Sequence, residues 1–471
     1  MKGTFIGDCR KNRFNLLIFI IYAAFFCFTL VTGSPIYVND TFQYDNQMVM
    51  REPVYGLLMH ITRLISPQNY YWYVIAIQNI IAIAANTIIT ISISRKFSLN
   101  KAVSLLVAVI QLAPYILTYF FSETHVVLTN SLMTEGILVS VYPLAFICLL
   151  NALHSRNPLG RESIAAIFIL LMLSLIRGQM MFLFVEWLLV AFVVLLERKN
   201  KLKKTVMQML AVILTFISVF ALRSLIVRSY NYCESGMFVD TASGKTTFAT
   251  NVLYVSDRED GRSIKDEKLR ELFYKIYDEA DEGKKNYKYA KGGIISRALY
   301  HETSHDTIKY AYLIENAKQY VGETKGIYVD QYNELIVEID EVALEMALYI
   351  LPGAFIRYLK NYISIITFGF IRSVAYVNSV FIAYAAFIYI MAVTLTVVLF
   401  IKNRNSKSAA AMTIVLIMII GNVCATGLMI NCLSRYMVYN IALFYIAGLL
   451  ELVELAGLKS GGKNGIQKSE I

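Results

Sequence analysis

The residue types best suited to chemistry lie in a polar stretch, from Val38 to Leu58, that follows the first apolar run of the chain. Its ionisable side chains, which stand among aromatic ones, are Asp40, Asp45, Arg51 and Glu52. A carboxylate can take a proton from a hydroxyl, and a guanidinium presents several donors in a fork that matches phosphate oxygens. A loop that joins two helices needs only a few residues, so this length and charge favour a functional site over a simple solvated loop.

Further candidates lie at the ends of other apolar runs. Arg177 follows a short run, and an Arg at membrane depth costs ~3 kcal/mol on insertion scales, so it is expected to face a cavity or a partner. Arg435 opens the last apolar run, and Glu135 lies near the start of another. The alternative for each arginine is a side chain that snorkels to the lipid headgroups. The alternative for Asp40 is an acid that caps a helix or turn.

The composition places these residues in an integral membrane protein. Of the 471 residues, 57% are hydrophobic and only 17% are charged, and the mean hydropathy is +0.54. These values are too apolar for a soluble chain of this length. The formal net charge of +10 does not indicate nucleic-acid binding, because the long polar segment from Glu234 to Glu345 is net acidic and the basic excess lies in the membrane part.

Ten apolar runs are predicted to cross the membrane. The first run is long enough for a ~30 Å hydrocarbon core, and it is interpreted as an uncleaved anchor with its N-terminus in the cytoplasm. The predicted spans are Phe14–Gly33, Tyr71–Ile93, Ala102–Phe121, Thr129–Leu153, Ser163–Ile176, Met180–Leu196, Thr205–Val227, Val377–Ile401, Ala409–Asn431 and Tyr436–Gly457.

The charge of the loops gives the expected orientation. Basic residues gather in alternate loops, such as those around Arg95, 198–204 and Lys402, as the positive-inside rule requires of cytoplasmic loops. The remaining loops, including the polar stretch around Asp40, then share the outer face. The sequence therefore predicts an all-α polytopic membrane protein with both termini in the cytoplasm.

A long polar segment before the last three spans is expected to form a helical cap on the outer face. From Ile264 to Tyr277, apolar residues recur at three- and four-residue spacing among charges. Leu351-Pro352-Gly353 is expected to break this pattern and to lead into a helix in the membrane interface. The predicted divisions are an N-terminal membrane domain (1–229) with the first outer loop (34–70), an extracytoplasmic cap (230–350), an interfacial helix (351–376), C-terminal membrane helices (377–458) and a cytoplasmic tail (459–471).

The six cysteines do not indicate a disulfide framework, because three of them fall inside predicted spans and Cys9 lies on the predicted cytoplasmic side. Cys233 and Cys432 share the predicted outer face, and their spacing leaves open whether they pair. The sequence contains no zinc-ligand spacing, P-loop or dinucleotide glycine pattern.

Four passages, in this order and with one predicted sidedness, carry a family resemblance. They are Asp40 with Arg51-Glu52-Pro53-Val54-Tyr55, Met133-Thr134-Glu135, Tyr349-Ile350-Leu351-Pro352-Gly353-Ala354-Phe355-Ile356-Arg357-Tyr358, and Ser434-Arg435-Tyr436. In these passages the chain resembles the GT-C class of membrane glycosyltransferases, the superfamily dependent on polyprenyl-phosphate sugars that includes protein O-mannosyltransferases and the aminoarabinose transferase of lipid A. The first loop departs from the pattern at Glu52, where some members carry a basic residue, and it lacks an Asp-x-Asp pair.

The resemblance implies an inverting, hexosyltransferase-like enzyme that moves a sugar from a polyprenyl-phosphate donor to a hydroxyl of a cell-surface glycan, lipid or protein. Asp40 is then the expected general base, and the expected phosphate-binding residues are Arg435, Arg177 and Arg51. The expected supporting residues are Asp45, Glu52, Tyr55, Glu135 and Tyr436. No cofactor or metal is indicated. The implied setting is the outer face of a bacterial plasma membrane, in cell-envelope polysaccharide biosynthesis.

Two other classes of protein stay open. A transporter or flippase of lipid-linked saccharides would also have many spans, although the hydropathy shows no internal repeat and few ions at mid-membrane depth. A polysaccharide polymerase of unrelated fold would use the same kind of donor. Dependence of activity on cap arginines such as Arg258 or Arg262, instead of Asp40, would favour the polymerase.

Overall fold

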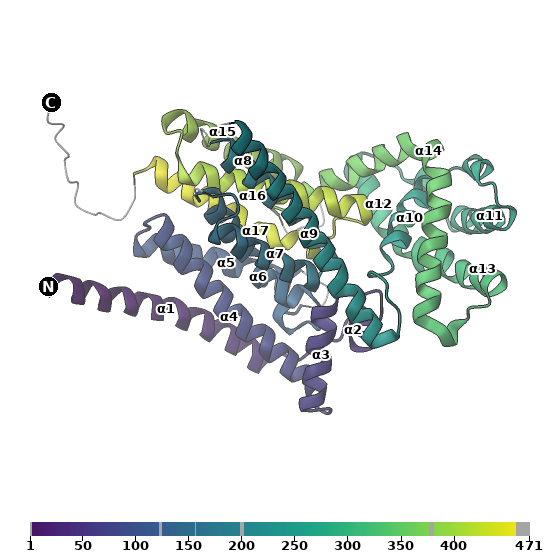
Figure 1. Cartoon of the computed structure of the whole chain (residues 1–471), viewed down its shortest axis with the longest axis horizontal. Coiled ribbons are helices and arrows are strands. Elements are labelled where there is room, and N and C mark those ends of the chain that lie inside the picture. The colour runs from purple at the N-terminus through teal and green to yellow at the C-terminus, as the bar shows by residue number, and fades with distance from the viewer. Residues whose placement is uncertain (1, 122–124, 156, 198–201, 376–380, 458–471) are drawn as a thin grey trace.

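The computed structural model describes residues 2–121, 125–155, 157–197, 202–375 and 381–457, which fold mainly into helices (Figure 1). The helices before the cap are α1 (Lys2–Thr32), α2 (Thr41–Asp45), α3 (Pro53–Ile65), α4 (Tyr70–Lys96), α5 (Lys101–Phe121), η1 (Leu128–Asn130), α6 (Glu135–Leu153), α7 (Arg161–Ile176), η2 (Gly178–Met181), α8 (Phe182–Leu196) and α9 (Leu202–Ser235). Then follow α10 (Gly244–Val255), η3 (Arg258–Ser263), α11 (Glu267–Glu282), η4 (Tyr287–Tyr289), α12 (Ile294–Asp306), η5 (Thr307–Ile314), α13 (Glu315–Lys325), η6 (Val329–Gln331) and α14 (Tyr332–Arg372). The last helices are α15 (Ile382–Lys402), α16 (Lys407–Met429) and α17 (Ser434–Leu455). Strand pairing in the described part of the chain is limited to one isolated bridge between Ile36 and Ser131.

The chain is an all-α polytopic membrane protein, as the sequence predicts. Ten helical stretches of the described residues are long and apolar enough to cross a membrane. Large apolar side chains such as Phe28, Leu214 and Phe387 are exposed on these helices. Such exposure suits contact with lipid chains rather than with water, so the lipid bilayer is the expected surrounding of the bundle.

The set of ten stretches differs from the predicted set at two places. The predicted span Ser163–Ile176 falls in α7, which has 16 residues and is shorter than the ~20 residues that a crossing needs. Arg177 ends α7 because its backbone is extended (φ −153°, ψ 121°). The ten stretches include Val329–Arg372 instead. This stretch is long and apolar enough to cross a membrane, because apolar residues continue through most of α14.

The predicted break at Leu351-Pro352-Gly353 is wrong. α14 is one helix of 41 residues that runs through the proline, so the end of the predicted cap and the predicted interfacial helix are a single element. The helix is packed on both sides of the proline, because Ile350 and Ala354 are fully buried and Arg357 pairs with Asp260. This tertiary packing outweighs the backbone hydrogen bond that a proline removes.

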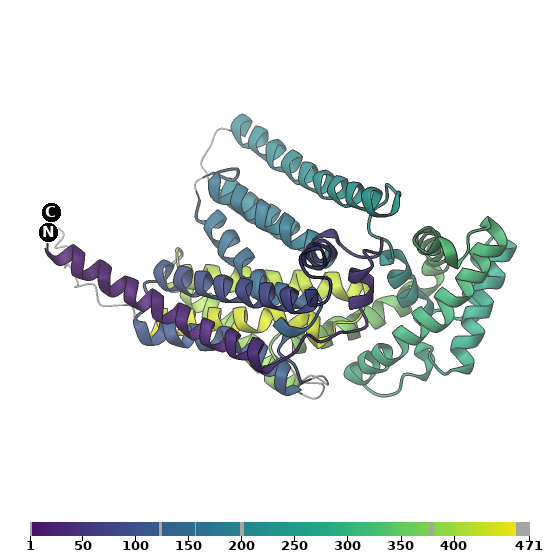
Figure 2. The same cartoon turned by 90° about the horizontal axis from the view of Figure 1, so that it is seen from below.

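The cap consists of α10 to α13 with their connecting turns and the first half of α14, and it lies at one end of the helix bundle. Figures 1 and 2 show it at the end opposite to the start of α1. The cap contacts the bundle where the Asn251 side-chain amide of α10 donates to Leu428 O at 3.4 Å. The link from α9 into the cap contacts the predicted first outer loop, because Ala242 N–H donates to Val49 O at 2.9 Å. This loop therefore lies where the bundle meets the cap.

A buried ion pair ties the predicted first outer loop to α9. Glu52, just before α3, contacts Arg223 of α9, and both side chains are almost fully buried. We predict that Arg223→Met lowers the free energy of unfolding by about 3–5 kcal/mol, because it leaves a buried carboxylate without its cation. Denaturant unfolding of the purified protein in detergent measures this loss. The Glu52→Gln/Arg223→Met variant should recover much of it, and a single Arg223→Met variant as stable as the wild type would contradict the prediction.

Candidate functional site

Asp40 lies directly before α2, and the neighbouring Thr41 side chain helps to fix its position there. The Thr41 hydroxyl donates to Leu132 O at 2.8 Å, which ties α2 to the segment before α6. The Asp40 carboxylate makes no hydrogen bond to the first turn of α2, so it does not cap that helix. It instead faces two arginines: Arg51 Nη2 lies 2.7 Å from Oδ1, and Arg435 Nη1 lies 3.4 Å from Oδ2. Asp40 and Arg435 are 395 residues apart in the chain.

Arg51 is held in place by the rest of its own loop. Its Nε donates to Gln43 Oε1 at 2.6 Å, and its guanidinium lies 4.9 Å from the centroid of the Tyr44 ring. Tyr44 packs edge-on against Tyr55 at 4.9 Å, and the Tyr55 hydroxyl donates to Gln78 Oε1 at 2.9 Å. Tyr55, which the sequence predicts as a supporting residue, therefore lies behind Tyr44 and does not contact the charges directly.

Glu135 supplies a second carboxylate, because it is the first residue of α6 and is almost fully buried. Arg177 Nη1 lies 2.6 Å from its Oε1, and Arg435 Nε lies 3.9 Å from the same oxygen. The Tyr436 ring lies beside both arginines, 4.3 Å from the Arg177 guanidinium and 4.9 Å from that of Arg435. Both arginines thus contact protein partners, as expected for cations near membrane depth.

Most of the predicted site residues lie together, in what we call the arginine cluster: Asp40, Arg51, Glu135, Arg177, Arg435 and Tyr436. They come from loop and helix ends that are far apart in the chain. These ends meet because α6, α7 and α17 pack in one bundle with α4 and α5. The cluster lies at the end of the bundle that meets the cap.

Two predicted supporting carboxylates lie outside the arginine cluster. Asp45 pairs with Arg63 and accepts hydrogen bonds from the Tyr70 hydroxyl at 3.0 Å and the Tyr71 hydroxyl at 3.1 Å. Its lone pairs are largely used, so it anchors the end of α2 to α3 and α4. Glu52 is directed instead to Arg223 in α9, as described above.

The charge of the arginine cluster favours an anionic ligand. Its two carboxylates face three guanidiniums, so one positive charge is in excess. Burial would raise the pKa of the Asp40 carboxyl, but Arg51, Arg435 and Arg177 outweigh burial and hold this pKa below its usual value. Asp40 is therefore ionised at neutral pH and can accept a proton.

The cap adds residues to this region that the sequence does not single out. Lys309 and Tyr310 belong to η5, a π-helical segment, and both interact electrostatically with Asp40 and Arg51. The signal in the sequence is limited to a lysine directly after the apolar Ile308, within the predicted cap. No motif marks it, because the register of a π-helical turn cannot be read from ordinary helical spacing.

Metal ligands and thiols contribute little to the site. No group of three or more His, Cys, Asp or Glu side chains in the described ranges is placed to hold a metal ion. Cys233 and Cys432 both carry free thiols, and Cys432 is buried. The groups available for chemistry in the arginine cluster are therefore carboxylates, guanidiniums and phenols.

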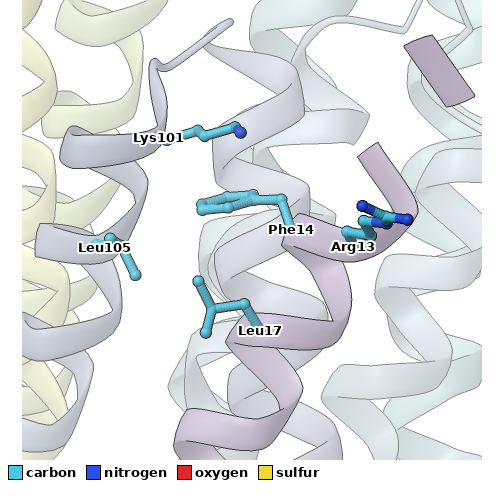
Figure 3. A pocket seen from close by; sticks show the side chains of 5 residues that line it. All are labelled: Arg13, Phe14, Leu17, Lys101 and Leu105. Carbon is cyan, nitrogen blue, oxygen red and sulfur yellow. The ribbon is translucent and has the colours of Figure 1, made fainter. Parts of the chain in front are cut away.

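A pocket at the other end of the bundle is separate from the arginine cluster. It lies between α1 and α5, and Figure 3 shows the residues that line it: Arg13, Phe14, Leu17, Lys101 and Leu105. The pocket is lined by two cations, Arg13 and Lys101. Lys101 Nζ lies 5.9 Å from the centroid of the Phe14 ring, so this cation already has an aromatic partner. The sequence predicts that this end faces the cytoplasm, and no carboxylate lines the pocket, so we assign it no part in the chemistry.

Comparison with known proteins adds no relative, because no family model, no curated protein and no solved structure matches the chain. The function is therefore inferred from the arginine cluster and its position.

Proposed function

We propose that this chain is a membrane glycosyltransferase that moves a sugar from a polyprenyl-phosphate donor to a hydroxyl acceptor. The observation that carries the proposal is the position of Asp40 between Arg51 and Arg435, where the bundle meets the cap. Transfer from a lipid-linked sugar needs a base for the acceptor and cations for the phosphate at the lipid–water boundary. The arginine cluster offers both, and the resemblance of its residues to the GT-C class supports the same reaction.

In the proposed reaction, Asp40 takes the proton of the acceptor hydroxyl while the acceptor oxygen attacks the anomeric carbon. The bond between this carbon and the phosphate oxygen breaks. The bonding electrons leave with polyprenyl phosphate, which gains one negative charge. Arg435 and Arg177 are the proposed partners of that charge, because preorganised cations stabilise charge that develops in the transition state. Attack opposite to the leaving phosphate inverts the anomeric configuration.

Donor binding is proposed to make Asp40 more basic. Arg435 contacts Asp40 at 3.4 Å, whereas Arg51 contacts it at 2.7 Å, so the Arg435 contact is the weaker of the two. A phosphate competes for Arg435 because a guanidinium binds phosphate oxygens in a forked geometry. Asp40 then loses part of the positive charge that lowers its pKa, at the moment when the donor is present.

The proposed setting is the outer face of a bacterial plasma membrane, in the synthesis of cell-envelope polysaccharides. The distribution of basic residues supports this orientation, because they gather in loops predicted to be cytoplasmic and the arginine cluster lies at the other end. The proposed partners are the lipid-linked donor and a hydroxyl of a surface glycan, lipid or protein. The proposed reaction requires no cofactor.

The acid limb of the pH profile tests the role of Asp40. Transfer needs ionised Asp40, so activity is lost as pH falls through its pKa, which lies below the usual value for Asp. We expect kcat/KM of the wild type to fall only at a pH below the usual pKa of an Asp carboxyl. Arg51→Gln removes one of the charges that lower this pKa, so the acid limb should move to higher pH. A limb that stays in place in Arg51→Gln would contradict the assignment of Asp40 as the base.

One observation favours transport as a second candidate function. Glu186 of α8 is buried within a candidate span, and neither of its carboxylate oxygens has a hydrogen-bond partner among the described residues. Ionisable groups at membrane depth often mark an ion or proton pathway. A transporter of lipid-linked sugars would move its substrate across the bilayer without forming a new glycosidic bond.

The polymerase alternative gains little from the cap arginines that would favour it. Arg258 pairs with Asp278, and Arg262 pairs with Glu259. Both pairs are exposed on the surface of the cap, where ion pairs contribute little to stability. Such exposed side chains do not enclose a ligand.

A further inference from the structure

Lys309 is a buried cation of the cap without an anionic partner. Its residue is only 6% exposed, in η5, where the helix is π-helical. Its ammonium donates to the hydroxyls of Thr247 at 2.7 Å and Ser243 at 3.2 Å, and it forms no ion pair with any carboxylate that the structure describes. Two neutral hydroxyls compensate a buried charge only in part, because burial of an unpaired ion is costly.

Two of the carboxylates that act on the charge of Lys309 have other hydrogen-bond partners. Asp340 accepts hydrogen bonds from Thr246 N–H at 2.6 Å and from the Thr246 hydroxyl at 2.7 Å. Asp306 lies 3.1 Å from Nδ1 of His305. The two acids interact with Lys309 only over longer distances, so its positive charge remains available to a ligand.

The backbone places Lys309 beside the arginine cluster. Ser243, its hydroxyl partner, lies directly before α10 and has a left-handed backbone (φ 74°), and the preceding residue, Ala242, donates to Val49 O in the first outer loop. Val49 is two residues before Arg51. A π-helical turn is rare and frequent at functional sites, and here it holds the lysine at the boundary between the cap and the loop.

We propose that Lys309 binds a phosphate group of the ligand from the cap side, facing Arg51 and Arg435 on the bundle side. This inference rests on the proposed function for the source of the phosphate, which is a prenyl phosphate rather than free phosphate. The phosphate replaces the two hydroxyls as the partner of the ammonium and supplies the missing negative charge. The cap thereby closes the site over the ligand.

The titration behaviour of Lys309 is consistent with this role. Burial, and then the nearby charge of Arg51, lower the pKa of the Lys309 ammonium to about 8, although Asp306, Asp340 and Asp40 oppose the change. The cation therefore begins to lose its proton just above neutral pH in the absence of ligand. A bound phosphate keeps the ammonium protonated, so phosphate affinity should fall as the pH rises from 7 to 9.

The test compares Lys309→Met, Lys309→Arg and the control Lys245→Met in the purified full-length protein in detergent. Lys245 is a suitable control, because it lies on α10 but is exposed and paired with Glu341. The probes are geranylgeranyl phosphate, the alcohol geranylgeraniol and inorganic phosphate, and the measurements are the dissociation constant and the unfolding temperature without ligand. We expect Lys309→Met to weaken geranylgeranyl phosphate binding at least about tenfold, as for the loss of a charge-assisted hydrogen bond, and Lys245→Met to leave it unchanged.

The unfolding temperature separates a ligand-binding role from a structural one. Lys309→Met should be as stable as the wild type or more stable without ligand, because it removes an uncompensated buried charge. Unchanged affinity with a lower unfolding temperature would overturn the inference while leaving the proposed function intact. If Lys309→Met does not fold, the test rests on Lys309→Arg. The affinity of this variant for geranylgeranyl phosphate should stay constant from pH 7 to 9, because a guanidinium stays protonated. A fall in affinity like that of the wild type would overturn the inference.

The probes separate the possible sources of the phosphate. Binding of geranylgeranyl phosphate, but of neither other probe, supports a lipid-linked phosphate. If inorganic phosphate binds as tightly as geranylgeranyl phosphate and this binding is lost in Lys309→Met, Lys309 forms a phosphate site. That result would contradict a lipid-linked donor. A wild-type protein that binds no probe would overturn the proposed function together with the role of Lys309.

Discussion

Asp40→Asn should lower the rate of sugar transfer by about 10²–10⁴-fold, which is the usual contribution of a positioned general base. The substitution keeps the size and polarity of the side chain but removes its ability to take a proton. Donor affinity should be retained or increased, because Arg51 and Arg435 lose a competing carboxylate. A turnover assay with a polyprenyl-phosphate sugar, run beside a donor-binding measurement, separates the two effects.

The matched control for this prediction is Asp45→Asn. Asp45 lies in the same loop, but its carboxylate is bound to Arg63 and to the hydroxyls of Tyr70 and Tyr71. Its replacement should reduce stability more than it reduces the chemical step. Normal turnover by Asp40→Asn would remove Asp40 as the base, and a larger rate loss in Asp45→Asn would transfer that role to Asp45.

Arg435→Ala should weaken donor binding by about 10–100-fold, because a hydrogen bond to a charged group contributes about 1.5–3 kcal/mol. Arg435 is suited to this role because it is partly exposed and its contact with Asp40 is long, so a phosphate can reach it. Arg435→Lys should recover only part of the affinity, since an ammonium cannot reproduce a forked contact. A direct binding measurement with a prenyl phosphate gives the three dissociation constants.

The control for Arg435 is Arg258→Ala, which removes an exposed arginine of the cap that is paired with Asp278. Donor binding should not change in this variant. The opposite pattern, with binding lost in Arg258→Ala and kept in Arg435→Ala, would contradict the arginine cluster as the donor site and favour a polymerase that uses the cap.

The fold class could be predicted from the sequence because apolar runs of membrane length are a strong signal. The predicted break in α14 failed because it depends on tertiary packing. The proline in the middle of α14 suggested a break, yet burial of Ile350 and Ala354 on either side keeps the helix continuous.

The candidate site could be predicted only in part. Loop charge assigned Asp40 and Arg435 to one face of the membrane, but it gave no distance between residues that are 395 positions apart. It also could not choose among the carboxylates of the first loop, because their different partners come from α3, α4 and α9. Lys309 was not singled out, since a buried lysine in a π-helical turn resembles the many exposed cap lysines in sequence.

The most direct test of the central claim is the identity of the product. The purified protein is reconstituted in liposomes with a pool of polyprenyl-phosphate sugars and a mixture of glycan, lipid and peptide hydroxyl acceptors. Mass spectrometry then follows free polyprenyl phosphate and new glycosides. The proposed function predicts that the wild type forms both in equal amounts, and that Asp40→Asn forms almost none. Lipid-linked sugar that crosses the bilayer intact, with no new glycosidic bond, would contradict it and favour a transporter.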